Sequence, residues 1–368
     1  MKIIIRNCNV AELDIPLKYA TKLYNEFAIR HPNAFYLRTR QRGMQNWDGK
    51  IKYITKTGQF KIGLLPSVYK RCIELGIKPI IVDMRQPLPK VSKVVTQIGK
   101  YKLRPEQEKA VKAILSNKLG ETPFQIGVLD YTVNAGKTLI MSALYLSYKK
   151  QLKTLLITND SDWLNQARDE FKQYLPGEDI TFVQGKVLNW SNFTIGMVQS
   201  ISRNMKYYQN ELAKIDMVLI DEADQGGSKQ YQNVITRLFN TRVRIGLSGT
   251  IYMSKLAKDK VKNMNLRCFF GDVIAEFKLK DSIKKGYSTK TIVKTVEGKP
   301  WFGNWESDCM SYNEIYDDSI THNKIAWTMA LDRLKWNLNQ GRYPALVVCK
   351  HIAHCENLCK FFKKKLDN

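Results

Sequence analysis

Residues 126–138 combine, in one short stretch, the residue types that bind nucleotide phosphates. The stretch reads Ile-Gly-Val-Leu-Asp-Tyr-Thr-Val-Asn-Ala-Gly-Lys-Thr, an apolar run that predicts a buried strand, followed by small residues and the start of a helical pattern. In such a strand, loop and helix, backbone N–H groups at the helix N-terminus bind phosphate, a lysine reaches the β- and γ-phosphates, and a threonine hydroxyl binds Mg²⁺. We therefore expect ATP and Mg²⁺ here, with contacts from Asn134, Ala135, Gly136, Lys137 and Thr138.

This loop departs from the full phosphate-binding pattern at its first glycine. The pattern G-x-x-x-x-G-K-[ST] places glycine where this sequence has Tyr131, and Asn134 also replaces a usually small residue. From this stretch alone, two interpretations stay open. It is either a phosphate-binding loop that is bulkier around the α- and β-phosphates, or an ordinary helix that starts at Gly136.

A pair of carboxylates supplies the complementary chemistry. Asp221-Glu-Ala-Asp224 directly follows the apolar run 216–220, so it falls at the carboxyl end of a predicted strand, where open α/β sheets bind their ligands. Asp221 would bind Mg²⁺ through water, and Glu222 would orient or deprotonate the water that attacks the γ-phosphate. A plain acidic turn is the alternative, but the coincidence with Gly136-Lys-Thr138 favours catalysis.

A third polar turn follows the next apolar run, residues 242–247. It reads Ser248-Gly-Thr250, and its hydroxyls are expected to hydrogen-bond Asp224. Such a contact would couple the state of the nucleotide to a neighbouring domain.

Predicted strands and helices alternate along the part of the chain that positions these groups. Buried strands are predicted at 126–129, 153–158, 194–198, 216–220 and 242–247, and helices at 104–119, from 138 onward and at 162–171. Near-continuous apolar strands alternating with helices predict an α/β fold, in which a parallel sheet is covered on both faces.

Composition limits the partners. The net charge of +25 over 368 residues favours a polyanionic partner, most often nucleic acid, over a merely soluble basic protein. No apolar run reaches the length of a membrane span, and the N-terminus does not resemble a signal peptide. Seven irregularly spaced cysteines predict reduced thiols in a cytosol-like compartment, which is the host cytosol if a phage encodes the chain.

Residues 1–90 are predicted to be a small, basic α/β domain. Pro87-Leu-Pro89 marks the transition to a linker, which is predicted to span residues 91–100. Residues 1–100 contain nineteen Lys or Arg and only six Asp or Glu. Residues 35–42 alternate in period two, which predicts a strand with three arginines on one face, and Asp48-Gly49 predicts a hairpin turn. Residues 63–76 predict a helix, with Ser67 as a possible cap and Gly76 as its stop. The expected DNA contacts, against an alternative of solvated surface, are Arg38, Arg40, Arg42, Trp47, Lys50 and Lys52.

Four motifs resemble those of a known family in their order along the chain. Arg104-Pro-Glu-Gln107, Gly136-Lys-Thr138, Asp221-Glu-Ala-Asp224 and Ser248-Gly-Thr250 are similar in order and spacing to the Q-motif and motifs I, II and III of superfamily 2 helicases. The stretch 46–52, Asn-Trp-Asp-Gly-Lys-Ile-Lys, resembles the opening domain of phage UvsW-type recombination helicases. The likeness extends to Phe270-Gly-Asp272 and to residues 346–351.

The resemblance implies an ATP-driven DNA helicase that unwinds or branch-migrates forked DNA. It implies a RecA-like domain with the ATP site at 101–285 and the start of a second, incomplete RecA-like domain at 286–368. By the same resemblance, Gln107 would read the adenine edge near Arg104, and Gln199 and Ser200 would touch the DNA backbone.

Several departures from the family bear on these expectations. Asn159-Asp160 replaces a proline–threonine pair, which puts one phosphate contact to DNA in doubt. Residue 224 is aspartate, where many DNA helicases have histidine. Motifs V and VI are not visible, so the sequence predicts either a truncated product or one part of a split enzyme, with weak ATP turnover and a separate chain or missing C-terminus completing it.

Two further alternatives remain from the residues. Cys349, His351, His354, Cys355 and Cys359 could hold a metal, but the absence of a C-x₂-C pair favours ordinary core and surface positions. Besides an ATP-driven helicase, the chain could be a DNA-binding ATPase that remodels without unwinding, or a DNA binder with a dead nucleotide site. The pair Asp221-Glu222 argues against the last of these.

Overall fold

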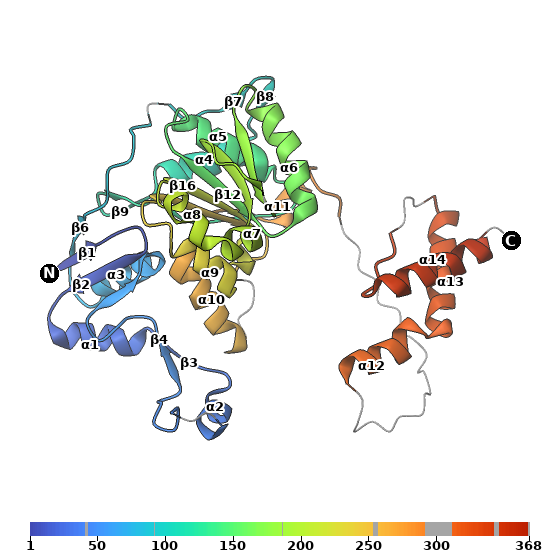
Figure 1. Cartoon of the computed structure of the whole chain (residues 1–368), viewed down its shortest axis with the longest axis horizontal. Coiled ribbons are helices and arrows are strands. Elements are labelled where there is room, and N and C mark those ends of the chain that lie inside the picture. Colours follow the sequence, from blue (N-terminus) through green and yellow to red (C-terminus); the bar gives the residue numbers. More distant parts are fainter. Residues whose placement is uncertain are drawn as a thin grey trace. The chain divides into compact units, whose positions relative to one another are not determined.

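The computed structural model describes residues 1–40, 43–91, 93–185, 187–252, 257–290, 311–341 and 346–366. The chain divides into two compact units, Met1–Lys290 and Thr291–Asn368 (Figure 1). The first unit holds the motifs that the sequence singles out, and its main elements are a larger and a smaller sheet.

The larger sheet of the first unit has eight strands. Every neighbouring pair is parallel, apart from an antiparallel pair at one edge. The parallel sheet predicted from the sequence is therefore confirmed, and all five predicted strands belong to it. The strand order is β14 (Val187–Leu188), β13 (Ile180–Gln184), β15 (Phe193–Met197), β12 (Thr154–Thr158), β16 (Met217–Asp221), β17 (Val243–Ser248), β11 (Ile126–Tyr131) and β18 (Val273–Phe277).

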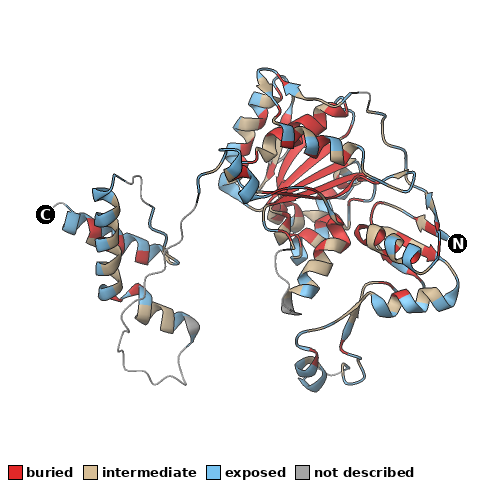
Figure 2. Ribbon diagram, turned by 180° about the vertical axis from the view of Figure 1, so that it is seen from behind, coloured by how far each residue is buried: buried red, intermediate tan, exposed pale blue. Residues whose placement is uncertain are grey.

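Helices cover both faces of this sheet, because successive strand residues point to opposite sides. In β12, Leu155 and Ile157 join one buried cluster, while Leu156 joins the other. Figure 2 shows the strands buried between these two layers. One face carries α4 (Pro105–Leu115), α5 (Lys137–Ser147) and α6 (Ser161–Tyr174), and the other carries α7 (Val198–Arg203), α8 (Met205–Leu212), α9 (Lys229–Ile235) and α10 (Ala257–Phe270).

Short elements connect these layers. The helix expected at 104–119 is shorter than predicted, because the chain leaves α4 at Ser116 and forms a two-stranded ribbon. A second ribbon precedes α4, and a short helix follows β18. These elements are β9 (Lys118–Leu119), β10 (Thr122–Pro123), β7 (Gln97–Ile98), β8 (Tyr101–Lys102) and α11 (Leu279–Lys284).

The N-terminal part forms a smaller mixed sheet in the order β5, β2, β1, β6. Its helix α3 starts at Leu65 rather than at Ser67, so the proposed serine cap is wrong, but Gly76 does end the helix in a left-handed conformation (φ 74°). The elements are β1 (Lys2–Ile5), β2 (Val10–Asp14), α1 (Leu17–Glu26), β5 (Gln59–Lys61), η1 (Ile62–Leu64), α3 (Leu65–Glu74) and β6 (Ile80–Asp83).

The predicted basic strand at 35–42 is wrong. Ala34–Arg40 forms the helix α2, which lies in a long excursion between β3 (Ala28–Arg30) and β4 (Lys50–Lys52). Asp48-Gly49 therefore does not turn between two adjacent strands. The alternation was misleading because the eight residues 35–42 are too few to distinguish the two-residue period of a strand from the period of a helix.

Residues of the second unit described by the structure form helices around Leu331, Leu358 and Phe362. Residues 346–350, to which the family likeness extends, form no strand, and the described residues of this unit contain no other strand that could pair with them. Leu346 and Val348 are instead exposed. The helices are α12 (Tyr312–Tyr316), the π-helical turn η3 (Asp317–Thr321), α13 (Lys324–Asn339) and α14 (Ile352–Leu366).

The described residues contain neither a membrane-spanning helix nor a cluster of metal-ligating side chains. None of their helices is long and apolar enough to cross a bilayer, and no group of three or more His, Cys, Asp or Glu side chains is arranged to hold a metal. His354 stacks on Trp327 with ring centroids 5.9 Å apart, and Cys355 and Cys359 are exposed.

Candidate nucleotide site and comparisons with known proteins

The cation and the two carboxylates singled out in the sequence meet at the carboxyl edge of the larger sheet. Lys137 is the first residue of α5, Asp221 is the last residue of β16, and Glu222 follows it. Lys137 Nζ lies 3.8 Å from Asp221 Oδ1 and 3.6 Å from Glu222 Oε1. The positions of β16 and α5 in the fold therefore bring the candidate phosphate-binding and water-activating groups together.

The loop before α5 has the backbone shape of an anion-binding turn. Asn134 (φ 63°) and Gly136 (φ 73°) are both left-handed, which turns the chain sharply between β11 and α5. The first N–H groups of α5 have no partner within the helix, so they are available to bind phosphate oxygens.

Arg104 and Gln107 hold this loop from α4. Gln107 Nε2 donates to the Ala135 carbonyl (2.9 Å), and Arg104 Nη2 donates to the Asn134 carbonyl (3.1 Å). Gln107 Oε1 also accepts from the Arg104 backbone N–H (2.8 Å), which fixes the start of α4. From the sequence we expect adenine contacts at Gln107, whereas the hydrogen bonds that brace the loop have no signal in the sequence.

The side chain of Tyr131 does not enlarge the phosphate loop. Tyr131 is the last residue of β11, is fully buried, and donates its hydroxyl to the Glu106 carbonyl (2.8 Å). The bulk expected around the phosphates is therefore directed into the core between the sheet and α4. Asn134, by contrast, is exposed on the loop.

Burial sets the electrostatics of the carboxylate pair. Asp221 is only 6% exposed, and burial raises its pKa, while the charge of Lys137 opposes that rise. Glu222 is half-exposed and adopts a left-handed backbone conformation (φ 49°). A non-glycine residue in this conformation is strained, and such strain is often found at functional sites.

The donor set at this edge fits Mg²⁺. The Thr138 hydroxyl and the Asp221 carboxylate are hard oxygen ligands, and Mg²⁺ binds such oxygens together with waters and substrate phosphates. Lys137 supplies the positive charge beside them. We therefore keep Thr138 and Asp221 as the candidate metal ligands.

Ser248 links the end of β17 to the carboxylate turn. Its Oγ donates to Asp224 Oδ1 (3.1 Å) and also accepts from the Thr250 backbone N–H (3.1 Å). The Thr250 hydroxyl contacts Ser248 Oγ (3.3 Å) rather than Asp224. Only one of the two hydroxyls expected at Asp224 therefore reaches it directly.

Comparisons with known proteins agree with this geometry. The family described as "Type III restriction enzyme, res subunit" matches residues 100–253. The ATP-dependent DNA helicase UvsW of Enterobacteria phage T4 is 22% identical over 351 residues, which covers 88% of this chain and 65% of UvsW. The chain resembles the UvsW-type helicases of superfamily 2. It spans less than two thirds of the length of that relative.

Further matches extend this likeness. A protein of Acanthamoeba polyphaga mimivirus named as an ATP-dependent RNA helicase is 26% identical over 147 residues, 40% of this chain and 27% of that protein. Two crystal structures of T4 UvsW match with TM-scores of 0.59 and 0.58, each at 20% identity. The first covers 75% of this chain and 100% of that structure, and the second covers 99% and 73%. The parallel sheet is thus the RecA-like fold found in UvsW.

The residues expected to touch DNA on the larger sheet differ in exposure. Ser200 is buried, and its hydroxyl accepts from the Gly185 N–H (3.0 Å), so it is not presented to DNA. Gln199 is half-buried and donates to the Asn159 carbonyl (3.2 Å). Asp160 accepts from two N–H groups at the start of α6, so the departure at 159–160 has a capping role.

The residues expected to touch DNA in the N-terminal part are mostly exposed. Arg38 and Arg40 lie on α2, on different sides because residues two apart in a helix are rotated by roughly 200°. Arg42 lies outside the described residues. Trp47 Nε1 donates to the Lys50 carbonyl (3.0 Å), and Lys52 pairs with Asp48 (3.1 Å), so this turn is fixed by its own side chains.

Replacing Gly136 with alanine is expected to weaken ATP binding at least tenfold. A Cβ at this position would lie 2.3 Å from Gln107 Nε2, and φ is 73°, so the loop would shift away from its brace. Gly177→Ala is the matched control, because Gly177 has a similar φ (82°) but open space around it. Equilibrium binding of a fluorescent ATP analogue measures both variants, and equal affinities would contradict the role of the brace.

Proposed function

We propose that this chain is an ATP-dependent DNA helicase or translocase of superfamily 2 that acts on branched or forked DNA during phage replication, recombination or repair. Its substrate is ATP with Mg²⁺, and its partner is DNA, including a single strand tracked during movement. The host cytosol is the proposed location. The observation that carries the proposal is the convergence of Lys137 Nζ on Asp221 and Glu222 within 3.8 Å.

The geometry supports a division of work within this site. Lys137 and the N–H groups of residues 134–138 would hold the phosphates, and Thr138 and Asp221 would hold Mg²⁺, which neutralises the phosphate charge when bound. Glu222 is the more exposed carboxylate, so it is the group that water reaches, and it would orient or deprotonate the attacking water. Arg104 and Gln107 would position the loop and contact the nucleotide base.

A motor that translocates on DNA without unwinding it is the second candidate. The observation that favours it is the match of residues 100–253 to the restriction-enzyme family. Both candidates use the same ATP site, so only the DNA product separates them.

The test compares ATP hydrolysis and strand displacement by the same protein. ATP hydrolysis that rises with DNA, together with displacement of a strand from a forked duplex, is the expected result for a helicase. DNA-stimulated hydrolysis without displacement, but with removal of a protein block from the duplex, would identify the translocase. Failure to bind ATP would overturn both.

We propose that α2 and the turn at 47–52 contact duplex DNA through phosphates. Arg38 and Arg40 are exposed, and so are the neighbouring rings of Phe35 (81% exposed) and Tyr36 (53% exposed). Basic groups of this kind bind phosphate and release counterions, whereas exposed aromatic rings pack against sugars or bases. Gln199, Lys50 and Lys52 remain candidates for further contacts.

Replacing Arg38 and Arg40 together with alanine is expected to weaken duplex and forked-DNA binding. The logarithm of the binding constant falls linearly with the logarithm of the salt concentration, and each phosphate contact adds about 0.9 to the steepness of that line. Loss of both arginines should therefore reduce the steepness by up to about 2. Binding measured by fluorescence anisotropy at several salt concentrations tests this, and adding Arg42→Ala extends it. Lys109→Ala with Lys112→Ala, two exposed positions on α4, is the control. An unaltered slope in the arginine variant would show that α2 does not contact DNA.

A further inference from the structure

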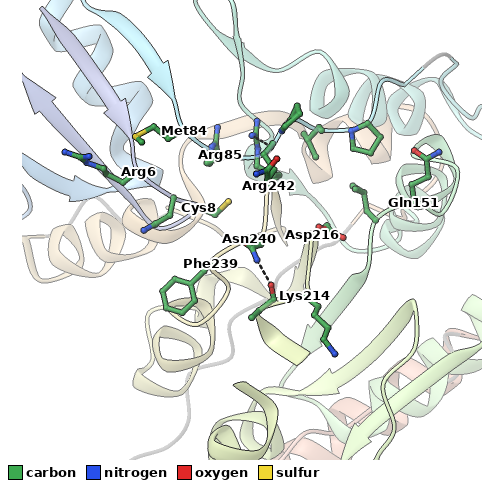
Figure 3. A pocket seen from close by; sticks show the side chains of 17 residues that line it. Arg6, Cys8, Met84, Arg85, Gln151, Lys214, Asp216, Phe239, Asn240 and Arg242 are labelled. Carbon is green, nitrogen blue, oxygen red and sulfur yellow. Dashed lines mark hydrogen bonds between the residues drawn. The ribbon is translucent and has the colours of Figure 1, made fainter. Parts of the chain in front are cut away.

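A cavity of about 630 Å³ lies between the N-terminal sheet and the amino ends of the larger sheet's strands. Leu152, Asp216 and Arg242 line it, and each stands immediately before or close to the start of β12, β16 or β17. The nucleotide site lies at the opposite, carboxyl ends of these strands. Figure 3 shows the cavity with residues of both layers around it.

The ionisable lining of this cavity is strongly positive. Arg6 and Arg85 contribute from the N-terminal part, Arg242 and Lys214 contribute from the larger sheet, and Asp216 is the carboxylate that faces them. Arg6 pairs with Glu12 (2.9 Å) and Lys214 pairs with Glu211 (2.7 Å), so these two charges are balanced nearby.

The two deeper arginines share a single carboxylate. Arg85 Nε lies 2.8 Å from Asp83 Oδ1, and Arg242 Nη2 lies 3.3 Å from Asp83 Oδ2. Their side chains are only 2% and 8% exposed. Burial, and then the neighbouring charge of Arg85, lower the pKa of Arg242. Two buried cations on one anion leave a positive charge without a partner, which is costly in a low-dielectric setting.

Each of these arginines also has an unused donor. Arg85 Nη1 and Arg242 Nε have no hydrogen-bond acceptor among the described residues. In Figure 3 the two guanidinium groups lie next to each other at the wall of the cavity. Nearby, burial raises the pKa of the Cys8 thiol, so this group stays neutral and adds no negative charge. Buried donors without acceptors are rare in folded proteins, and a bound ion is one arrangement that satisfies them.

We propose that this cavity binds the phosphate group of a small phosphorylated ligand, such as free pyrophosphate or a nucleoside monophosphate. A phosphate has several acceptor oxygens and the charge that the Arg85 and Arg242 pair lacks. The volume suits a small ligand, and guanidinium groups this deeply buried lie out of reach of a duplex backbone. Because Arg85 and Arg242 come from different layers, the bound anion would fasten the N-terminal sheet to the larger sheet. The inference does not depend on the proposed helicase function.

Binding of pyrophosphate and AMP to the full chain carrying Lys137→Ala tests this site apart from the nucleotide loop. Isothermal titration calorimetry should show one site per chain. Arg242→Gln should weaken pyrophosphate binding at least tenfold. Asp216→Asn should strengthen pyrophosphate binding several-fold, because the substitution removes a carboxylate that repels the anion. Lys172→Gln, an exposed position on α6, should leave it unchanged.

One further variant and one DNA control complete the experiment. The side chain of Lys214 is 60% exposed, so the Lys214→Gln variant should fold normally, which circular dichroism verifies. This variant should bind pyrophosphate a few-fold more weakly. It therefore tests the site even if Arg242→Gln does not fold. A ten-nucleotide single strand serves as the DNA arm. If only that strand bound, or if pyrophosphate binding ignored both Lys214→Gln and Asp216→Asn, the proposal would be overturned.

Discussion

Glu222→Gln is expected to lower the rate of ATP hydrolysis by about 10²–10⁴-fold while leaving ATP binding in place. Glutamine has the size of glutamate but cannot orient or deprotonate water as a carboxylate does. Glu222 is half-exposed and lies 3.6 Å from Lys137 Nζ, so its replacement removes one negative charge near the triphosphate and should not weaken binding. Single-turnover hydrolysis and binding of a fluorescent ATP analogue, measured on the same preparations, test both halves of this expectation.

Lys137→Ala is the complementary variant. The substitution removes the ammonium group that lies beside Asp221 and Glu222, so the two carboxylates would then repel the triphosphate of ATP. A charged hydrogen bond contributes about 1.5–3 kcal/mol, which corresponds to roughly 10–150-fold in ATP affinity. The pair of variants therefore separates binding from chemistry. Normal hydrolysis by the Glu222→Gln protein would remove Glu222 from the mechanism.

The sequence was sufficient for the parts of the fold that depend on local pattern. Buried parallel strands read as continuous apolar runs, and the polar turns after β11, β16 and β17 stand at the carboxyl edge because parallel strands end there. That rule alone placed Lys137 near Asp221 and Glu222, and the structure brings them within 3.8 Å.

Features that depend on packing were not predictable in the same way. The position of Tyr131 suggested a bulky loop, but its ring turns into the core, because the side chain of a strand residue follows the pleat. Ser200 was matched to a family motif, yet its hydroxyl is used by Gly185. The strand β18 was missed since it is an edge strand with mixed burial, and such strands have no continuous apolar run.

Among the contacts that join the two sheets of the first unit are those of a buried cation, Arg244, that no local pattern indicated. Arg244 lies on β17, where the run 242–247 reads as an apolar strand, and its side chain is 1% exposed. Its Nη2 donates to the Cys8 carbonyl and to Asn9 Oδ1 (both 2.8 Å), and its Nη1 donates to the Phe269 carbonyl (3.2 Å). The guanidinium thus ties the β1–β2 turn to the larger sheet and to the end of α10.

Arg244→Leu is expected to lower the free energy of unfolding by about 3–5 kcal/mol. Leucine fills part of the volume, but it leaves three buried acceptors without a donor, and each such acceptor costs about 1–3 kcal/mol. Arg267→Leu is the matched control, because Arg267 is 41% exposed and pairs with Asp272 at the surface, where an ion pair contributes about 0–1 kcal/mol. Urea unfolding followed by circular dichroism measures both variants.

The pKa of Arg244 sets the pH range in which the variant and the unmodified chain are compared. Burial lowers the pKa of Arg244 to about 10, below its value in the unfolded chain. A buried base with a lowered pKa costs stability as long as it stays protonated in the folded state. That cost is relieved only as the pH rises above about 10. Between pH 6 and 8, Arg244 is charged in both states, so the difference between Arg244→Leu and the unmodified chain should be constant. A loss of less than 1 kcal/mol, or one equal to that of Arg267→Leu, would show that Arg244 does not hold the N-terminal sheet in place.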